Sequence, residues 1–342
     1  MKKINFALIG CGHIGKRHIE MIQRHPEARL VAVCDILPLE KLGLKGLDVP
    51  FFTSAEEMLS ADIQIDVVCI ATPNGWHEAH ALMALQAGKH VLIEKPMALS
   101  KASCERILFK ALEKGKQVFC VMQNRYSPPS VWLKEVLNQG ILGEIYMVQV
   151  NCFWNRDERY YTPESWHGTK QWDGGTLFTQ FSHFIDMLYW LFGDISDIKG
   201  KAYNFSHKKS IDFEDSAHFS FQFHAGAAGT LHYSTAVWDK NMESSLTLIA
   251  ENGALKIGGQ YMNEVVYCHI EDYEMPVLPP ANPANDYGGY KGSAANHGYV
   301  FENVIDTLKG RASIAVNALE GMKVVEIIEK MYAVVAGKIS TV

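Results

Sequence analysis

Apolar and polar positions follow different patterns in the two halves of the chain. Up to residue 122, short apolar runs alternate with longer segments whose apolar residues recur at a helical period. The runs predict strands at 4–9, 30–34, 67–71, 90–93 and 117–121, and the segments between them predict helices at 14–25, 54–60, 76–88 and 100–115. Strands that alternate with helices predict an α/β fold, in which helices cover both faces of a parallel sheet.

After residue 123 the pattern changes to longer alternating segments. One helix is predicted near 128–139, and strands without helices between them follow at 145–154, 198–205, 217–223, 228–235, 245–250 and 265–270. Such a series predicts an open, mostly antiparallel sheet. Residues 276–298 are rich in Pro, Gly and Asn and predict a long loop, which is often functional. Two predicted helices, 294–309 and 317–336, complete the pattern.

These patterns predict two domains. The first covers residues 1–122, and the second, an α+β domain, covers residues 123–342. A chain of 342 residues is long enough to form two hydrophobic cores. We expect that the last helix can pack back on the first domain.

One segment of the second domain, 174–194, has a polar face of an unusual kind. Its leucine, isoleucine and phenylalanine residues follow the helical period and form one broad apolar face. The opposite face carries Thr176, Thr179, Gln180, His183 and Asp186. It has no Lys, Arg or Glu, which a solvated helix face normally carries. This pattern predicts a helix that forms the wall of a cleft.

Composition and charge narrow the class of protein. The chain is 48% hydrophobic and 20% charged, with a formal net charge of −6 and no long run of Lys and Arg. We therefore expect no nucleic-acid partner. The apolar runs are too short to span a membrane, and the first one is too short for a signal peptide. These features predict a soluble, cytoplasmic protein.

Cysteine and histidine usage gives no indication of a metal centre. The seven cysteines are scattered and form no CxxC pattern, which is typical of reduced thiols in a cytosolic protein. The fourteen histidines are also dispersed. We expect no metal site.

A glycine-rich turn predicts a dinucleotide site. The hexapeptide Gly10-Cys11-Gly12-His13-Ile14-Gly15 follows the first strand and begins the first helix. This spacing allows the backbone to approach a pyrophosphate at the helix N-terminus. Asp35, at the end of the second strand, can accept hydrogen bonds from a ribose diol and would repel a 2′-phosphate, which favours NAD over NADP. The alternative is a tight glycine turn with an incidental Asp.

Two further loops follow strands of the same sheet. Ala71-Thr72-Pro73-Asn74 ends the strand at 67–71, and Trp76 and His77 begin the next helix. Glu94-Lys95-Pro96 ends the following strand. Ligands bind at the carboxyl ends of strands in such sheets, so Lys95 can assist proton transfer there. The alternatives are a helix-capping role for Asn74 and an exposed position at the sheet edge for Lys95.

These motifs, taken in order, resemble the Gfo/Idh/MocA family of nicotinamide-dependent sugar and polyol oxidoreductases. The resemblance extends through Asn124-Arg125-Tyr126 and Gly143-Glu144 to the DGG…H..D pattern of 173–186. It implies an N-terminal Rossmann domain and a C-terminal domain whose open sheet commonly mediates oligomerisation, for which we expect a homotetramer. It also implies that His183 faces the substrate and that Lys95 approaches from the Rossmann side. The expected cofactor-binding residues are Gly10, Gly12, His13, Ile14, Gly15, Asp35, Ala71, Thr72, Asn74, His77, Glu94 and Lys95.

The chain departs from the family pattern at Thr179. Many members have an Asp at this position, one helical turn before the catalytic His. Without that carboxylate, the orientation and basicity of His183 cannot be assumed. The division of work between Lys95 and His183 therefore stays open. Asp186 is expected to form a structural hydrogen bond, and the alternative is a catalytic role.

The wording from Tyr160 to His183 looks like the branch that oxidises UDP-N-acetylglucosaminuronic acid at C3. Those enzymes supply the 3-keto sugar to an aminotransferase in bacterial surface-polysaccharide synthesis. A uronate and a diphosphate need local cations, and Arg156, Arg159 and Lys170 lie just before the helix. The alternative is that the three form a solvated loop. The expected substrate-binding residues are Lys95, Arg156, Arg159, Tyr160, Lys170, Thr179, Gln180 and His183.

Other functions stay open from the sequence alone. A related dehydrogenase can act on a neutral polyol or sugar such as inositol. Some family members have lost catalysis and serve as NAD-sensing regulators, although the presence of both Lys95 and His183 argues against this. A plain NAD-binding scaffold is a further alternative. In some relatives 2-oxoglutarate reoxidises the bound cofactor, and this route is also open here.

Overall fold

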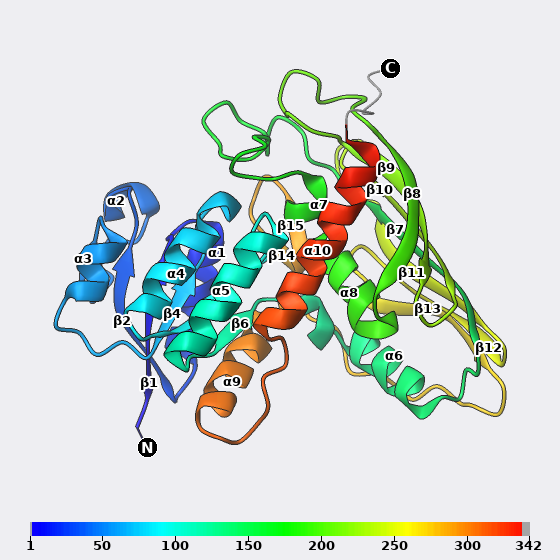
Figure 1. The fold of residues 1–342 in the computed structure, drawn as a ribbon, viewed down its shortest axis with the longest axis horizontal. Coiled ribbons are helices and arrows are strands. Elements are labelled where there is room, and N and C mark those ends of the chain that lie inside the picture. The colour runs from blue at the N-terminus through cyan, green and yellow to red at the C-terminus, as the bar shows by residue number, and fades with distance from the viewer. Residues whose placement is uncertain (1, 337–342) are drawn as a thin grey trace. The chain divides into compact units, whose positions relative to one another are not determined.

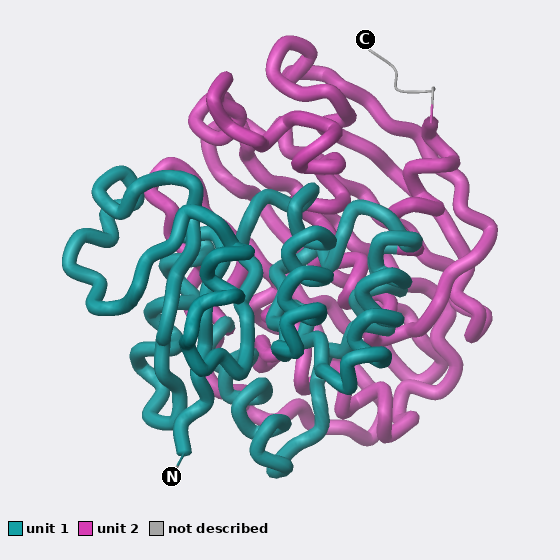
Figure 2. The backbone as a smooth tube through the Cα atoms, turned by 60° about the vertical axis from the view of Figure 1, so that its left-hand side comes forward, with its two compact units in different colours: residues 1–122, 297–325 teal, residues 123–296, 326–342 magenta. Residues whose placement is uncertain are grey.

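The computed structural model describes residues 2–336, which form two compact units. The first unit consists of the chain up to Met122 and of His297–Val325, and the second consists of Gln123–Asn296 and the described residues from Glu326 onward. Figure 2 colours the first unit teal and the second magenta. Among the described residues, no helix has the length and hydropathy needed to cross a bilayer.

The first unit contains a six-stranded parallel sheet in the order β3-β2-β1-β4-β5-β6. Its strands are β1 (Ile4–Ile9), β2 (Ala28–Cys34), β3 (Phe51–Phe52), β4 (Val67–Ile70), β5 (His90–Ile93) and β6 (Val118–Cys120). The predicted Rossmann architecture is confirmed. The strand order reverses between β1 and β4, and in such sheets this reversal marks the ligand crevice.

Helices connect these strands (Figure 1). They are α1 (His13–Arg24), α2 (Leu39–Leu42), α3 (Ala55–Ser60), α4 (His77–Gln86) and α5 (Lys101–Lys114). Local chemistry sets their ends: the hydroxyl groups of Ser54 and Ser100 accept the N–H groups that begin α3 and α5, and Gly115 ends α5 in the left-handed conformation. Helix α4 packs beside α5.

Residues 297–325 belong to the first unit, although the sequence predicted them in the second domain. Helix α9 (His297–Leu308) packs on α1, and the ring of its Phe301 lies 5.7 Å from that of Phe6 in β1. The first turns of α10 (Ala318–Val335) also belong to this unit. Apolar burial against the parallel sheet explains this return of the chain.

The second unit contains a seven-stranded sheet in the order β13-β12-β11-β7-β10-β9-β8. Its strands are β7 (Ile145–Phe153), β8 (Ile195–Tyr203), β9 (Ser216–Phe223), β10 (Ala228–Ser234), β11 (Glu243–Ala250), β12 (Gly253–Gly258) and β13 (Glu264–Ile270). Strands β7 and β10 pair parallel, and the other neighbours pair antiparallel, which confirms the predicted mostly antiparallel sheet. The predicted loop at 276–298 holds a small hairpin of β14 (Ala284–Asp286) and β15 (Lys291–Ala294).

One face of this sheet is covered by helices α6 (Pro128–Gln139), α7 (Thr176–Thr179) and α8 (Ser182–Phe192), as Figure 1 shows. Aromatic rings form the contact: Phe184 of α8 lies 5.8 Å from Trp154, and Phe192 lies 5.3 Å from Phe223. On β9, buried alanine and phenylalanine residues alternate with exposed His218, Ser220 and Gln222. The opposite face of the sheet is therefore open in the single chain.

The helix predicted at 174–194 is broken into α7 and α8. The break lies at Gln180 and Phe181, where the N–H groups of both residues donate to the carbonyl oxygen of Thr176. The bond from Phe181 spans five residues and widens the turn, a local geometry that is frequent at functional sites. The prediction of one continuous helix is therefore wrong, because periodicity does not reveal a widened turn.

Two helical glycines give a matched test of packing in the first unit. A Cβ on Gly321 would lie 2.5 Å from the Sγ atom of buried Cys120, whereas one on Gly298 would meet only Met21 Sδ, at 3.6 Å. We expect Gly321→Ala to lower the melting temperature, because overpacking costs about 1–3 kcal/mol. Gly298→Ala should keep or raise it, because alanine favours a helix by up to about 1 kcal/mol. Thermal unfolding followed by circular dichroism measures both, and a stabilised Gly321→Ala variant would contradict this account.

Candidate active site

The glycine turn before α1 leaves space in front of the helix. Gly10 has a φ of +90°, and a Cβ there would lie 2.6 Å from the carbonyl oxygen of Ala71. A Cβ on Gly15 would overlap the carbonyl oxygen of Gly10. In contrast, a Cβ on Gly12 would meet no protein atom within 4 Å. Gly10 and Gly15 are therefore required by the packing of the protein's own backbone. The open space at Gly12 fits a pyrophosphate at the N-terminus of α1, where His13 and Ile14 begin the helix.

Asp35 lies directly after β2 and holds this turn in place. Its Oδ2 atom accepts the N–H of Cys11 at 2.7 Å, and its Oδ1 atom accepts the N–H of Leu37 at 2.9 Å. The residue is half-buried. A carboxylate oxygen has further lone pairs, so the fixed side chain can still accept a ribose hydroxyl.

His77 joins the two loops that follow β4 and β5. Its ring is buried, with Nδ1 at 2.7 Å from the carbonyl oxygen of Pro96 and Nε2 at 2.9 Å from that of Thr72. Burial lowers the pKa of His77, and the two carbonyl contacts oppose this effect. Helix α4 begins at His77, and the side chain of its N-cap residue, Trp76, makes no capping hydrogen bond. His77 therefore fixes the loops at 71–74 and 94–96 relative to each other.

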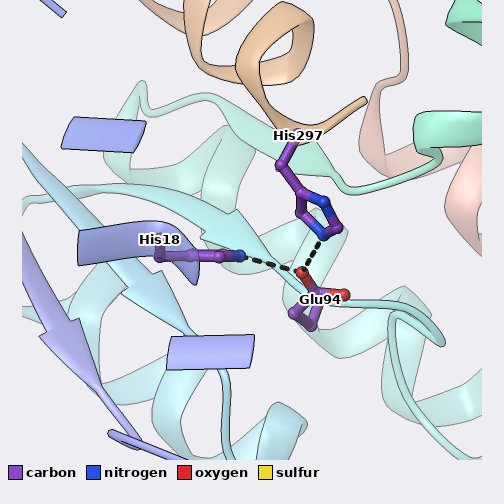
Figure 3. Close-up of side chains that lie close together, drawn as sticks. All are labelled: His18, Glu94 and His297. Carbon is purple, nitrogen blue, oxygen red and sulfur yellow. Dashed lines mark hydrogen bonds and ion pairs between the residues drawn. The ribbon is translucent and has the colours of Figure 1, made fainter. Parts of the chain in front are cut away.

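Glu94 was predicted to bind the cofactor, but its carboxylate is directed into the interior of the protein. Its Oε1 atom lies 2.8 Å from Nε2 of His18 and 3.5 Å from Nε2 of His297 (Figure 3). Its Oε2 atom accepts the N–H of Lys95 at 3.3 Å. Burial raises the pKa of Glu94, but the two histidines outweigh it and hold that pKa well below its usual value. Any cofactor contact of Glu94 is thus left to its main chain.

In the second unit, the polar face of α7 and α8 is buried and bonded to protein groups. Asp186 forms a two-bond pair with Arg125, at 2.6 and 2.9 Å. Thr179 donates to the carboxylate of Asp173, so a carboxylate does lie beside this departure from the family pattern. The predicted cleft wall is therefore built into a network of buried polar groups.

His183 lies in the first turn of α8 and is buried. Its Nε2 atom lies 3.4 Å from Nε2 of Gln123, a residue of the short 3₁₀ helix Gln123–Tyr126. The pair of Arg125 and Asp186 fixes the same 3₁₀ helix against α8. Gln123 was not predicted from the sequence, although it directly precedes the Asn-Arg-Tyr motif.

A buried carboxylate, Glu214, holds the turn before His183. It accepts hydrogen bonds from the hydroxyl groups of Thr176, Tyr233 and Tyr332, the last two at 2.9 Å. The Tyr332 oxygen in turn accepts the N–H of Leu177 at 3.1 Å. Burial raises the pKa of Glu214. Sequence reasoning missed this cluster, because its members come from distant segments with no common motif.

Arg156 is a buried cation in an aromatic box. Its guanidinium lies 4.9 Å from the ring of Trp154, 5.2 Å from that of Tyr160 and 4.9 Å from that of Tyr290. It is only 3% exposed, and it donates hydrogen bonds to two carbonyl oxygens and to the amide oxygen of Asn241. Within residues 2–336, no carboxylate lies within ion-pair distance of it, and its Nε atom has no hydrogen-bond partner. Burial lowers the pKa of Arg156.

The other two predicted cations have different surroundings. Arg159 makes several bonds to Asp157, at 2.6–3.0 Å, so its charge is already compensated. Lys170 is exposed. Tyr160 accepts a hydrogen bond from Nε2 of Gln180 at 3.0 Å, which links the box around Arg156 to the turn before α8. The three cations thus do not act as one equivalent set.

Two family models match the chain in its two halves. The oxidoreductase family with an NAD-binding Rossmann fold matches residues 4–122, and the GFO/IDH/MocA C-terminal domain matches residues 131–256. Together the two matches cover more than half of the chain. The NAD-binding family that matches residues 4–122 is consistent with the glycine turn, the open space at Gly12 and the position of Asp35, all of which fit NAD.

Two solved structures are similar over nearly the whole chain. The WlbA dehydrogenase from Bordetella pertussis, in complex with NADH and UDP-GlcNAcA, is 31% identical with a TM-score of 0.85 over 97% of this chain and 96% of that chain. The WlbA dehydrogenase from Chromobacterium violaceum, in complex with the same two ligands, is 30% identical with a TM-score of 0.85 over 99% and 95%.

Similarity to curated relatives is more limited. The inositol 2-dehydrogenase/D-chiro-inositol 3-dehydrogenase from Halalkalibacterium halodurans is 29% identical over 196 residues, which cover 56% of this chain and 53% of that relative. The chain thus matches about half the length of this relative, and likewise 52% of an uncharacterized oxidoreductase from Synechocystis.

Asp35 gives a direct test of cofactor choice. We expect Asp35→Asn to weaken NAD binding about ten- to a hundredfold and to reduce the preference against NADP, because a charge-assisted bond is worth about 1.5–3 kcal/mol. The amide oxygen can still accept the N–H of Cys11, so the contact with the glycine turn is kept, while the bond from the N–H of Leu37 is lost. Titration calorimetry with both cofactors measures the change. Equal use of NAD and NADP by the native protein would contradict the assignment.

Proposed function

Because the chain belongs to the GFO/IDH/MocA oxidoreductase family and its first unit is an NAD-binding Rossmann domain, we propose that it is an NAD-dependent dehydrogenase that oxidises UDP-N-acetylglucosaminuronic acid at its C3 hydroxyl. The similarity to two WlbA dehydrogenases that bind NADH and UDP-GlcNAcA supports this substrate. The product is the 3-keto sugar.

The observation that carries this choice is the buried Arg156. A buried cation is unfavourable unless an anion or many hydrogen bonds compensate it. The described residues supply carbonyl oxygens and aromatic faces but no carboxylate. A substrate with a uronate and a diphosphate would supply the missing negative charge, whereas a neutral polyol would not.

The proposed reaction removes a proton from the sugar hydroxyl as hydride leaves its carbon. When bound, NAD supplies the hydride acceptor. We assign the proton to His183, whose ring is already fixed beside Gln123. Lys95 donates a hydrogen bond to the same oxygen and stabilises its developing negative charge.

Buried amide oxygens add a way to recognise sugar hydroxyls. The Oε1 atoms of Gln123 and Gln180 are buried and have no hydrogen-bond partner among the described residues. A buried acceptor without a donor costs free energy, and a sugar hydroxyl would satisfy it. Gln180 is also bonded to Tyr160, so sugar recognition and the box around Arg156 share one network.

A second candidate is a dehydrogenase of a neutral polyol or sugar. The similarity to the inositol dehydrogenase favours it. In this case Arg156 is a structural residue, held only by its aromatic neighbours and carbonyl contacts. The charge of the preferred substrate separates the two candidates.

The proposed product also defines the partners. A 3-keto sugar is a substrate for an aminotransferase, so we expect such an enzyme to act next, and 2-oxoglutarate is a candidate for reoxidising the cofactor. We further propose that the open face of the seven-stranded sheet forms a homo-oligomer, because apolar side chains exposed on that face favour burial against a second copy. On that face Met147 of β7 lies opposite Ile249 of β11, and both are exposed.

Substitution of the two assigned residues tests the chemistry. We expect Lys95→Met and His183→Asn each to lower kcat. The decrease should be about 10²–10⁴-fold for the residue that is the general base, because proton transfer by a positioned side chain accelerates a reaction by about this factor. Calorimetry should show nearly native NAD affinity for both variants. Unchanged turnover by His183→Asn would overturn the assignment of this residue.

A panel of sugars tests the substrate. We expect the native protein to produce NADH with UDP-N-acetylglucosaminuronic acid, and to discriminate against UDP-N-acetylglucosamine, which lacks the carboxylate that we propose pairs with Arg156. Arg156→Met should raise KM for the uronate about ten- to a hundredfold, and Arg156→Lys should raise it less, because it keeps the charge. NADH production from myo-inositol or glucose, and none from the UDP-uronate, would favour the second candidate.

A further inference from the structure

Three buried side chains meet behind the loop that carries Lys95. His18 comes from α1, Glu94 follows β5, and His297 is the first residue of α9; their exposed fractions are 0%, 5% and 1%. Both imidazoles approach the same carboxylate oxygen, Oε1, as Figure 3 shows. All three belong to the first unit.

The unused ring nitrogens indicate the protonation of the cluster. The Nδ1 atoms of His18 and His297 are buried and have no hydrogen-bond partner among the described residues. A bare Nδ1 lone pair is less costly there than a buried N–H without an acceptor. His18 therefore carries its proton on Nε2 and donates it to the ionised Glu94, whereas Nε2 of His297 approaches the same carboxylate oxygen at 3.5 Å without completing a hydrogen bond.

The same observation argues against a metal ion. This is the one group of His, Cys, Asp and Glu within residues 2–336 whose ligand atoms lie close enough to share an ion. With Nε2 on a metal, each Nδ1 would carry a proton, and metal-bound histidines normally donate that proton to an acceptor. Neither ring of His18 or His297 has such an acceptor.

We propose that His18 and His297 are positioning residues that act through Glu94 to fix the main chain of Lys95. Oε1 of Glu94 accepts the N–H of His18 and lies 3.5 Å from Nε2 of His297, and Oε2 accepts the N–H of Lys95. Because His18 lies in the helix that begins at the glycine turn, the cluster also ties the pyrophosphate-binding helix to the Lys95 loop. The inference rests on the proposed function, in which Lys95 bonds to the reacting oxygen.

Variants in α9 separate the polar contact of His297 with Glu94 from the packing of the helix. His297→Phe keeps a ring but removes the nitrogen that faces Glu94, His297→Gln keeps a side-chain N–H, and Phe301→Leu changes packing on the same helix and against the ring of His18. We expect His297→Phe to lower kcat about 10- to 100-fold, because small displacements of a catalytic group have effects of this size. His297→Gln should recover most of the rate, and Phe301→Leu should keep it.

A double-mutant cycle shows whether the effect passes through Lys95. In the Lys95→Met background, His297→Phe should lower kcat no further, since both changes disable the same group. If His297→Phe lowers kcat by the same factor in both backgrounds, the histidine acts by another route and the proposal is overturned.

Amide hydrogen exchange gives a readout that does not depend on turnover. His297→Phe should speed exchange in residues 94–99 and leave β4 unchanged, and His297→Gln should restore the native pattern. Unchanged exchange at 94–99 in His297→Phe would overturn the proposal. Stoichiometric zinc in the purified protein, lost in His297→Phe, would also overturn it.

Failure of the proposed role of Lys95 and failure of the positioning role of the histidines give different experimental results. Full turnover by Lys95→Met would refute the proposed role of Lys95, whereas exchange at 94–99 would still report on the cluster. Normal turnover together with normal exchange in His297→Phe, with Lys95→Met impaired, would refute only the positioning role.

Discussion

A charge buried in a protein must be compensated, and this requirement shapes both units. The charge of Glu94 is stabilised by a hydrogen bond from His18 and by the nearby ring of His297, and that of Asp186 by an ion pair with Arg125. Removing one member of such a pair typically costs about 3–5 kcal/mol, because the other charge is then left buried alone. These pairs therefore specify where the surrounding segments lie more strictly than apolar contacts can.

Arg156 is the exception, and the exception has chemical meaning. Aromatic rings surround its guanidinium, but no carboxylate among the described residues neutralises its charge. The protein carries a formal net charge of −6, so a nucleotide sugar with a uronate and a diphosphate is not attracted by the molecule as a whole. Under the proposed function, a local cation in a dry site supplies the attraction that the overall charge does not.

The sequence was sufficient to predict five of the six strands of the Rossmann sheet, because their short apolar runs and the glycine hexapeptide are local signals, but the two-residue strand β3 was missed. It also predicted most strands of the second sheet from their alternation. It missed β12, whose glycine at each end weakens the alternating pattern, and the hairpin of β14 and β15 inside a loop-like composition. Local signals were thus sufficient where neighbours in sequence are also neighbours in the fold.

The site shows the limit of the same reasoning. Asp35 and the loops at 71–74 and 94–96 were identified from strand ends, but the partners of Glu94 and Thr176 were not. His18 and Glu94 are 76 residues apart, and Glu214 and Tyr332 are 118 apart. Only the folded chain brings such pairs together, and a single sequence carries no record of the pairing. The sequence likewise did not indicate that burial differs among the three cations, Arg156, Arg159 and Lys170.

The return of residues 297–325 to the first unit has a consequence for how the chain folds during synthesis. The ribosome releases Phe6 early, but Phe301, which packs against it, emerges only after most of the chain has been made. Until then the apolar surface of the nascent Rossmann sheet that α9 will cover stays exposed, and exposed apolar surface promotes aggregation. A fragment that ends at residue 122 would keep the glycine turn yet lack α9, so the two units of this protein are unsuited to separation by a single cut.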